Sequence, residues 1–390
     1  MLRLLSNAEL HAPAHLGLRH LLVGGGSVLW IGTERPTLDA SLGVEETDCG
    51  GRRVIPGLID GHVHLTGGGG EAGYETRVPP VPLSRFTLGG VTSVVGVLGT
   101  DDVTRDTAAL VATARGLEAE GLSAWCHTGG YHVPPVTLTG SVRGDIVHVD
   151  RIIGVGELAI SDHRSSQPTL DELLRVASEA HVGGLMTGKA GIVHLHVGDG
   201  ERGLDLVRRA LATAELPARV FHPTHVNRRR GLFDEAMALA EPGVTADVTA
   251  FPVAEGEDAW SAADAVTRWL DAGLPVARLT VSSDGGGCLP VFDADGRVTS
   301  MDVGAPGALA LTIAELLARG RALESFLPAF TSSVADLLRL PRKGRLEAGS
   351  DADLVILDSH GAVQDVMARG RWMVRDRTPV VRGTFEGALA

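Results

Sequence analysis

Short apolar segments rich in β-branched residues alternate with segments of helical periodicity between residues 57 and 344, and this alternation restricts the fold more than any other feature. The predicted strands of this region cover residues 91–98, 152–160, 192–197, 219–226, 244–251 and 278–283. Helices are predicted after Thr169, where Thr169-Leu170-Asp171-Glu172 forms a capping box, and after Ser261, where the cap is weaker. Repeated strand-then-helix units imply parallel strands with right-handed crossovers. The chain is therefore α/β, either a (β/α)8 barrel or an open doubly wound sheet.

The two ends of the chain differ from this central region. Residues 1–56 and 345–390 contain short strand patterns without a periodic segment of helical length, and residues 21–31 form a predicted hairpin around Gly24-Gly25-Gly26. We expect the two ends to pair into one small β-sandwich-like domain. The predicted organisation is a catalytic barrel over residues 57–344 and a small domain built from residues 1–56 and 345–390.

Several predicted strands end in side chains that bind metals. His62 and His64 lie two residues apart at the end of an apolar run, so their side chains project the same way from a strand. The residues that end the predicted strands are His62, His64, His196, His225 and Asp284. In a barrel the carboxyl ends of all strands share one face, which favours a barrel here and predicts a site for zinc or a similar divalent ion. His194 and His222 are assigned structural roles.

Composition excludes some classes of partner. The chain has 35 Lys and Arg against 48 Asp and Glu, a net charge of −13, without a basic block. Nucleic acid and anionic membranes are therefore not expected partners. Its three cysteines are widely spaced, which is typical of reduced thiols, and no apolar run has the length of a membrane span. We expect a soluble cytoplasmic protein.

The order of the ligands (HxH, a mid-chain bridging ligand, His, His, Asp) resembles the amidohydrolase superfamily, and local motifs resemble the bacterial isoaspartyl (β-aspartyl) dipeptidases. The most specific matching motifs are Gly67-Gly68-Gly69-Gly70-Glu71-Ala72-Gly73, Ser161-Asp162-His163-Arg164 and Thr224-His225-Val226-Asn227-Arg228. Together with weaker matches, they extend through nearly the whole chain. The resemblance implies a (β/α)8 barrel enzyme with two divalent metal ions, zinc being the expected ion.

The resemblance also implies how the metals are held. His62, His64 and Asp284 would bind one ion, and His196 and His225 the second, with the attacking hydroxide between them. Two such ions lower the pKa of a shared water and polarise the carbonyl under attack. Asp284 would accept the proton of that water and pass it to the leaving amine.

Five further residues match positions that bind the substrate in this family. Tyr131 would stabilise the developing oxyanion, and Glu71 would hold the free α-amino group of the substrate. Arg164 and Arg228 would bind the substrate carboxylates through paired hydrogen bonds. Thr100 falls on another substrate contact.

Glu157 departs from the family pattern. The family bridges its two ions with a carboxylated lysine a few residues before Ser-Asp-His-Arg, where this chain has Glu157. A glutamate carboxylate can also bridge two cations, but its side chain is shorter. One extra residue near Gly156 predicts a β-bulge that moves the backbone inward. The nearest lysine, Lys189, is a poor replacement. If the Glu157 side chain does not reach both ions, the site holds only one ion or binds two ions weakly.

Cys288 is the second departure, because the family has a serine near the substrate carboxylate at this position. A thiol is a weaker donor than a hydroxyl, so we expect changed affinity or specificity. A nucleophilic Cys288 is the less favoured alternative.

The predicted function is metal-dependent hydrolysis of isoaspartyl dipeptides, by a homo-oligomer whose partner is a small dipeptide substrate. One alternative is another amidohydrolase that acts on a small acidic amide, such as an N-acyl amino acid or a cyclic ureide. The other is a catalytically silent metal-binding oligomer.

Overall fold

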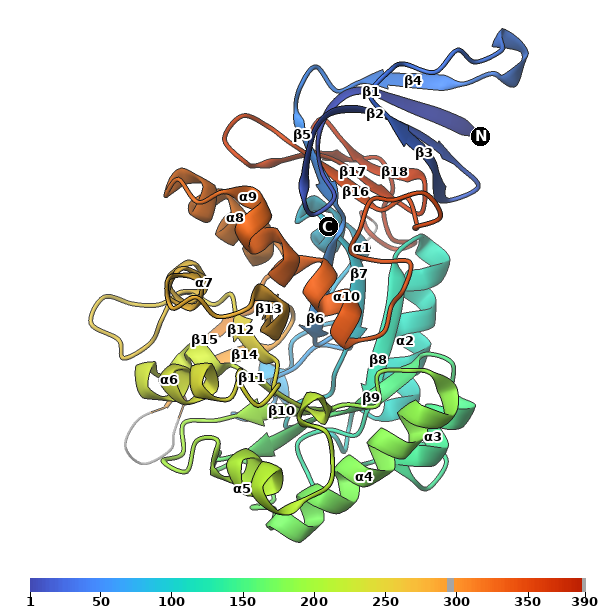
Figure 1. Cartoon of the computed structure of the whole chain (residues 1–390). Coiled ribbons are helices and arrows are strands. Elements are labelled where there is room, and N and C mark those ends of the chain that lie inside the picture. The colour runs from blue at the N-terminus through green and yellow to red at the C-terminus, as the bar shows by residue number, and fades with distance from the viewer. Residues whose placement is uncertain (293–297, 388–390) are drawn as a thin grey trace.

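A computed structural model describes residues 1–292 and 298–387. A sheet built from both ends of the chain lies at one end of the molecule, and parallel strands surrounded by helices form the rest (Figure 1). In the described part of the chain, no helix is long and apolar enough to cross a membrane.

The small sheet has nine strands. They are β1 (Leu2–His11), β2 (His15–Gly24), β3 (Ser27–Gly32), β4 (Glu45–Asp48), β5 (Arg53–Pro56), β16 (Leu354–Leu357), β17 (Val363–Ala368), β18 (Arg371–Arg375) and β19 (Thr378–Pro379). The two ends of the chain meet where β16 runs antiparallel to β5, with Ile356 opposite Val54. Side chains of both halves, including Leu5 and Trp372, share one apolar core. In its hydrogen bonds the domain is one continuous sheet, not the two sheets of a sandwich.

Eight parallel strands form the second part. The six strands that pair in sequence order are β6 (Leu58–Val63), β7 (Val91–Gly96), β8 (Ser123–Thr128), β9 (Ile152–Ile160), β10 (Val193–Val197) and β11 (Phe221–Thr224). The remaining two, β12 (Ala246–Thr249) and β13 (Leu279–Ser282), pair with each other. A parallel bridge between Val63 and Gly285 joins the segment after β13 to β6. The strands therefore form a TIM-like barrel.

The barrel differs from the fully closed one that the sequence predicted, because no backbone ladder joins β11 to β12 among the described residues. β11 is only four residues long, and its Pro223 has no N–H to donate. Side chains connect the two strands instead: Thr224 Oγ1 donates to Asp247 Oδ2 at 2.7 Å.

Helices follow most of these strands. They are α1 (Leu83–Leu88), α2 (Thr107–Glu120), α3 (Val142–His148), α4 (Leu170–Thr187), α5 (Asp205–Thr213), α6 (Arg230–Ala238), α7 (Ala262–Asp271), α8 (Ala308–Ala318), α9 (Leu323–Phe326) and α10 (Ser332–Leu337). The capping box at Thr169 is present, and Ser261 caps α7 through the N–H of Asp264. Two strands that follow β13 were not predicted: β14 (Cys288–Phe292) and β15 (Val298–Val303) form a hairpin.

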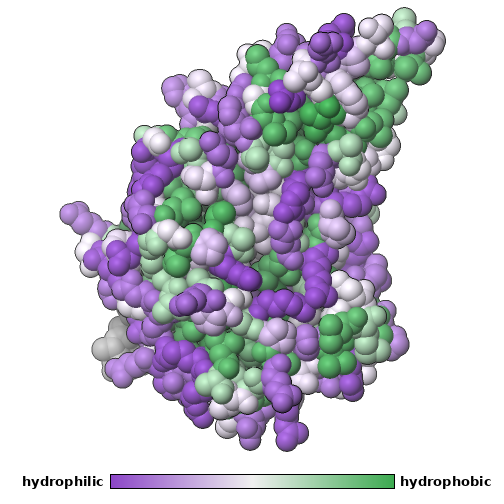
Figure 2. All heavy atoms as spheres, in the orientation of Figure 1, coloured by the Kyte–Doolittle hydropathy of each residue, from purple (hydrophilic) through white to green (hydrophobic). Residues whose placement is uncertain are grey.

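Exposed apolar residues are unevenly distributed. On the face in Figure 2 they gather over the small sheet at the top of the view. Large apolar side chains exposed on β2 and β3 include Leu16, Leu18 and Leu29. Extended apolar surface of this kind is typical of a surface that contacts another molecule.

Candidate metal centre

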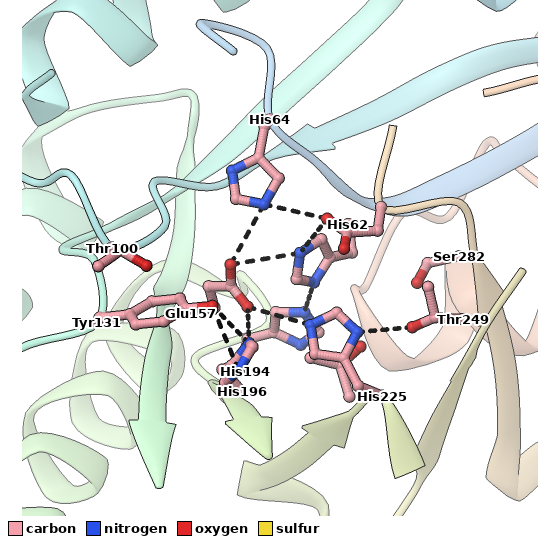
Figure 3. A network of polar contacts seen from close by, with 12 residues as sticks. His62, His64, Thr100, Tyr131, Glu157, His194, His196, His225, Thr249 and Ser282 are labelled. Atoms are coloured by element: carbon pink, nitrogen blue, oxygen red, sulfur yellow. Dashed lines mark hydrogen bonds and ion pairs between the residues drawn. The ribbon is translucent and has the colours of Figure 1, made fainter. Parts of the chain in front are cut away.

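The predicted ligands lie together at the carboxyl end of the barrel strands (Figure 3). His62 lies in β6 with His64 just beyond it, Glu157 lies in β9 and His196 in β10. His225 directly follows β11, and Asp284 is the second residue after β13. All six side chains are buried. Six groups from five strand ends thus share one small volume.

Two histidines and one aspartate form the first group. His64 Nε2 lies 3.1 Å from Asp284 Oδ1, and His62 Nε2 lies 3.4 Å from the same oxygen. Glu157 Oε1 lies 3.5 Å from His62 Nε2 and 3.3 Å from His64 Nε2. Two nitrogens and two oxygens therefore converge from four residues.

The second oxygen of Glu157 faces a different pair of histidines. Glu157 Oε2 lies 3.0 Å from His196 Nδ1 and 3.4 Å from His225 Nε2. Glu157, His225 and His62 also have ligand atoms within 4.8 Å of one another, whereas His196 falls outside that group. The carboxylate of Glu157 therefore lies between two sets of imidazoles.

Several buried polar atoms without hydrogen-bond partners indicate that this site is suited to a cation. His62 Nε2, Glu157 Oε1 and Asp284 Oδ1 are buried and have no hydrogen-bond partner in the described structure. Leaving three such atoms unpaired is costly unless a ligand compensates for them. Imidazole nitrogens with carboxylate oxygens are a donor set that suits zinc and related divalent ions.

The charges of the site also suit a cation. Burial opposes the charge of Glu157, but His62 and His196 hold the pKa of its carboxyl well below the usual value. Burial also opposes the charge of Asp284, yet the nearby imidazoles of His62 and His64 lower its pKa. Both groups are therefore carboxylates at neutral pH.

A bulge in β9 brings Glu157 into this position. Val155 pairs with Val193 and Leu158 with Leu195, so β9 has one more residue than β10 between the same two pairs. The register confirms the extra residue that the sequence predicted. Gly156 has φ +143°, and a Cβ there would lie 2.4 Å from the carbonyl oxygen of His194. Only glycine fits the close contact between these strands.

Two ligands have left-handed backbone conformations at the ends of their strands. His225 has φ +60° and Asp284 has φ +52°. Residues other than glycine rarely adopt such angles, and they are often found at functional sites. The buried Asp60 supports the second turn, because its Oδ1 accepts the N–H of Ser283 at 3.1 Å.

A cavity of about 610 Å³ opens beside the candidate metal centre. Its lining includes the predicted substrate-binding residues Glu71, Thr100, Tyr131, Arg164, Arg228 and Cys288. The structure thus brings all twelve predicted site residues to one end of the barrel strands.

Glu71 and Arg228 are two groups of this cavity that have unused binding capacity and lie outside the candidate metal ligands. Glu71 Oε1 accepts a hydrogen bond from Thr100 Oγ1 at 3.1 Å and lies 3.5 Å from Arg164 Nη1, whereas its buried Oε2 has no partner. The guanidinium of Arg228 makes no hydrogen bond or ion pair with the described residues. The cavity therefore offers one carboxylate oxygen and one guanidinium to a ligand.

Tyr131 lies between the cavity and the metal centre. Its Oη is 2.8 Å from His196 Nδ1, and the ring is buried. Burial and the nearby Glu157 raise the pKa of Tyr131 well above its usual value, so the phenol remains a donor.

Cys288, at the start of β14, is half-buried in the cavity wall. Burial, with a smaller contribution from Glu71, raises the pKa of its thiol to about 12. The thiolate is scarce at neutral pH, which opposes a nucleophilic role.

Asp162 was in a recognised motif, but the sequence assigned it no role. Arg164 donates to both of its oxygens, from Nε at 3.1 Å and from Nη2 at 2.8 Å, and His196 Nε2 lies 3.0 Å from Oδ2. Asp162 thereby orients Arg164, a predicted substrate-binding residue, and His196, a candidate metal ligand. The only signal in the sequence was its place between the strand end and Arg164.

His194 and His222 lie behind the metal centre. His194 Nε2 is 2.7 Å from His62 Nδ1, and a dashed line joins the two rings in Figure 3. Burial, with His127 and His62 nearby, lowers the pKa of His222 to about 3, and burial also lowers the pKa of His194. Both imidazoles are therefore neutral at pH 7.

Comparisons with known proteins agree with this fold. A crystal structure of β-aspartyl dipeptidase from the thermophilic, keratin-degrading Fervidobacterium islandicum AW-1, in complex with β-Asp-Leu dipeptide, superposes with a TM-score of 0.91 at 40% identity over 97% of each chain. Dihydropyrimidinase from Brevibacillus agri NCHU1002 shares the fold, with a TM-score of 0.68 at 18% identity over 98% of this chain and 97% of that one. Imidazolonepropionase from Paracoccus denitrificans is 26% identical over 87% of each chain. The amidohydrolase family model matches residues 53–373, and the chain therefore belongs to the amidohydrolase family.

Proposed function

We propose that this amidohydrolase is a metal-dependent dipeptidase that cleaves β-aspartyl dipeptides. The observation that carries the proposal is the pair of unpartnered groups in the cavity, Glu71 Oε2 and Arg228. A β-aspartyl dipeptide has a free amine and two carboxylates near the scissile amide, and therefore complements these charges. The 40% identity to a β-aspartyl dipeptidase over 97% of the chain supports the same conclusion.

The candidate ligands divide into two sets. His62, His64 and Asp284 would hold one ion, and His196 and His225 the second, with one oxygen of Glu157 directed to each set. When bound, two divalent ions, zinc by our proposal, would supply Lewis acidity that lowers the pKa of a water and polarises a carbonyl.

The residues of the chain would carry the protons and hold the substrate. Asp284, a carboxylate at neutral pH, accepts the proton of the attacking water and returns it to the leaving amine. Tyr131 donates to the carbonyl oxygen as negative charge develops there. The leaving group is then the free amino acid that follows the aspartyl residue.

Recognition of the substrate would depend on three charged side chains. Glu71 Oε2 accepts the α-ammonium, with Thr100 fixing the other oxygen of the same carboxylate. Arg228 and Arg164 bind the carboxylates, and Asp162 holds the Arg164 guanidinium in place. A buried charge pair of this kind gives strong selection, because a neutral analogue leaves the protein charge unpaired.

Hydrolysis of β-Asp-Leu by the zinc-loaded protein tests the proposal, with α-Asp-Leu as the matched isomer. We expect turnover of the β-isomer only, and a loss of about 10²–10⁴-fold in kcat for Asp284→Asn, the usual range for removing a general base. Absence of turnover would favour a catalytically silent metal-binding protein. Equal turnover by the Asp284→Asn variant would remove Asp284 from the mechanism.

A second candidate function is hydrolysis of a small acidic amide without a free amine, such as an N-acyl amino acid or a cyclic ureide. The low-identity match to imidazolonepropionase favours it, whereas the unpartnered oxygen of Glu71 opposes it. Glu71→Gln should lower kcat/KM for β-Asp-Leu by at least about 30-fold, equivalent to ~2 kcal/mol for a buried charge pair. If N-acetylated β-Asp-Leu or a cyclic ureide is the better wild-type substrate, the second candidate replaces the first.

The homo-oligomer also remains a proposal. The exposed apolar residues of β2 and β3 support it, because a second copy of the chain could cover them. Light scattering of the wild type and of Leu18→Lys would measure the subunit number and the contribution of this face.

A further inference from the structure

A chain of buried hydrogen bonds extends from the metal centre into the barrel. His62 Nδ1 lies 2.7 Å from His194 Nε2, and His194 Nδ1 lies 2.9 Å from His222 Nδ1. His222 Nε2 then lies 3.0 Å from Thr280 Oγ1, which donates to Asp247 Oδ1 at 2.6 Å. All five residues are at least 96% buried and belong to five different strands, β6, β10, β11, β13 and β12.

The far end of this chain determines the direction of its hydrogen bonds. The carboxylate of Asp247 accepts hydrogen bonds, here also from Thr224 Oγ1 and Ser282 Oγ. The second acceptor near the Thr280 hydroxyl, the carbonyl oxygen of Ala246 at 3.5 Å, has no proton to give either. Thr280 must therefore donate toward Asp247 or Ala246, and it can only accept from His222.

A neutral imidazole has one donor and one acceptor nitrogen, so this direction passes along the chain. If His222 Nε2 donates to Thr280, then His222 Nδ1 accepts from His194 Nδ1. His194 Nε2 in turn accepts from His62 Nδ1. The consequence is that His62 keeps a proton on Nδ1, so the lone pair of neutral His62 lies on Nε2.

His62 Nε2 is the unpartnered atom that faces Glu157 and Asp284 in the metal centre. A metal ligand needs its lone pair on the nitrogen that faces the ion, and the group bonded to the other ring nitrogen fixes that tautomer. The direction of the hydrogen bonds deduced from Asp247 therefore agrees with the His62 tautomer that the metal centre requires.

We propose that His194, His222 and Thr280 form a tautomer relay, a set of positioning residues that keeps the proton of neutral His62 on Nδ1 and so directs its lone pair toward the metal centre for an incoming ion. None of these three residues lines the cavity. We rest this proposal on the metal centre of the proposed function and not on the dipeptide substrate.

Paired variants at Thr280 test the relay farthest from the metal centre. Thr280→Val has almost the same shape but lacks the acceptor for His222, whereas Thr280→Ser keeps it. The measurement is zinc affinity by competition with a chelator, without substrate, on full-length protein. We expect Thr280→Val to lose about 10–100-fold in affinity at one site, the usual cost of removing an outer-shell partner, and Thr280→Ser to stay close to wild type.

Variants at His194 test the link next to the metal centre. The amide oxygen of His194→Gln can occupy the place of Nε2 and accept from His62, while His194→Asn reaches only the place of Nδ1. We expect the His194→Gln variant to retain the zinc affinity that the His194→Asn variant loses. With Co²⁺ in place of zinc, the ligand-field absorption should change in the His194→Asn and Thr280→Val variants. It should be preserved in the His194→Gln and Thr280→Ser variants.

Thermal unfolding of the metal-free proteins separates the relay from a purely structural role. If the relay acts on metal binding, the zinc affinity falls in Thr280→Val. The thermal unfolding midpoints of metal-free Thr280→Val and Thr280→Ser then remain equal. The proposal would be overturned if Thr280→Val bound zinc as tightly as the wild type. Equal losses of zinc affinity in Thr280→Val and Thr280→Ser would also overturn it. A protein that binds zinc through the relay without cleaving β-Asp-Leu would refute the proposed substrate alone.

Discussion

Glu157 directs one carboxylate oxygen to each half of the metal centre. Oε1 faces His62 and His64, and Oε2 faces His196 and His225. The bulge beside Glu157 inserts one residue into β9 at this point, next to a side chain shorter than a carboxylated lysine.

Removing the Glu157 carboxylate should therefore release metal. We expect two ions per chain in the zinc-loaded wild type and at most one in Glu157→Ala, measured by elemental analysis after gel filtration. Glu157→Gln is the matched control for size, and it should bind more weakly than wild type because it lacks the charge. A fully loaded wild type with one ion, or Glu157→Ala with two, would contradict the bridging role.

Metal binding should also depend on pH through His64. Burial opposes its protonation, but the nearby carboxylates of Asp284 and Glu157 raise its pKa to about 9 in the metal-free site. Below that pH, an incoming ion must displace a proton, so the apparent zinc affinity should rise from pH 7 to about pH 9. Calorimetry in buffers of different ionisation enthalpy would measure the released protons. A constant affinity over this range would contradict the shift.

At the scale of elements, the predicted strands were most accurate where β-branched residues dominate. β9 has the predicted bounds, residues 152–160, and β7 begins at the predicted Val91. β8 was missed, because Ser123-Ala124-Trp125-Cys126-His127-Thr128 contains one β-branched residue and no regular alternation. β11 is shorter than predicted, since its Pro223 and the left-handed His225 limit its pairing.

The bulge in β9 gives a prediction for one glycine. Gly156→Ala places a Cβ 2.4 Å from the His194 carbonyl oxygen, at φ +143°. The backbone conformation alone should cost ~1–3 kcal/mol, and movement of Glu157 should weaken zinc binding. Gly116→Ala, in the exposed middle of α2 with open space around it, should instead stabilise the fold by ~0.5–1 kcal/mol. Thermal unfolding and zinc titration would compare the two; unchanged zinc binding in Gly156→Ala would contradict the role of the bulge.

At the scale of the whole molecule, the barrel and the small sheet are connected by a buried lysine. Lys343 Nζ donates to Asp353 Oδ2 and to Ser123 Oγ, both at 2.6 Å, and lies 2.8 Å from Asp351 Oδ2. Ser123 begins β8 of the barrel, and Asp353 directly precedes β16 of the small sheet. One cation thus pairs with charges at the junction of the two parts.

Lys343→Met should destabilise this junction by ~3–5 kcal/mol, because it leaves the buried carboxylate of Asp353 without its cation. Arg342→Met is the matched control: its ion pair with Asp351 is largely exposed on the arginine side, so its loss should cost less than ~1 kcal/mol. Chemical denaturation would measure both, and equal effects would show that burial of Lys343 contributes little.

The sequence by itself determined the α/β class, the pairing of both chain ends in one small β domain, the twelve candidate site residues and the extra residue in β9, but not that this domain is one continuous sheet. These features are encoded by neighbouring residues or by motifs, so they can be recognised without knowing which strands meet. Only the tertiary structure decided which histidine each oxygen of Glu157 faces, that Asp162 joins Arg164 to His196, and that the ladder between β11 and β12 is interrupted. His62 and His194 are 132 residues apart, and their 2.7 Å contact depends on the register and curvature of the whole barrel, which no local pattern in the chain specifies.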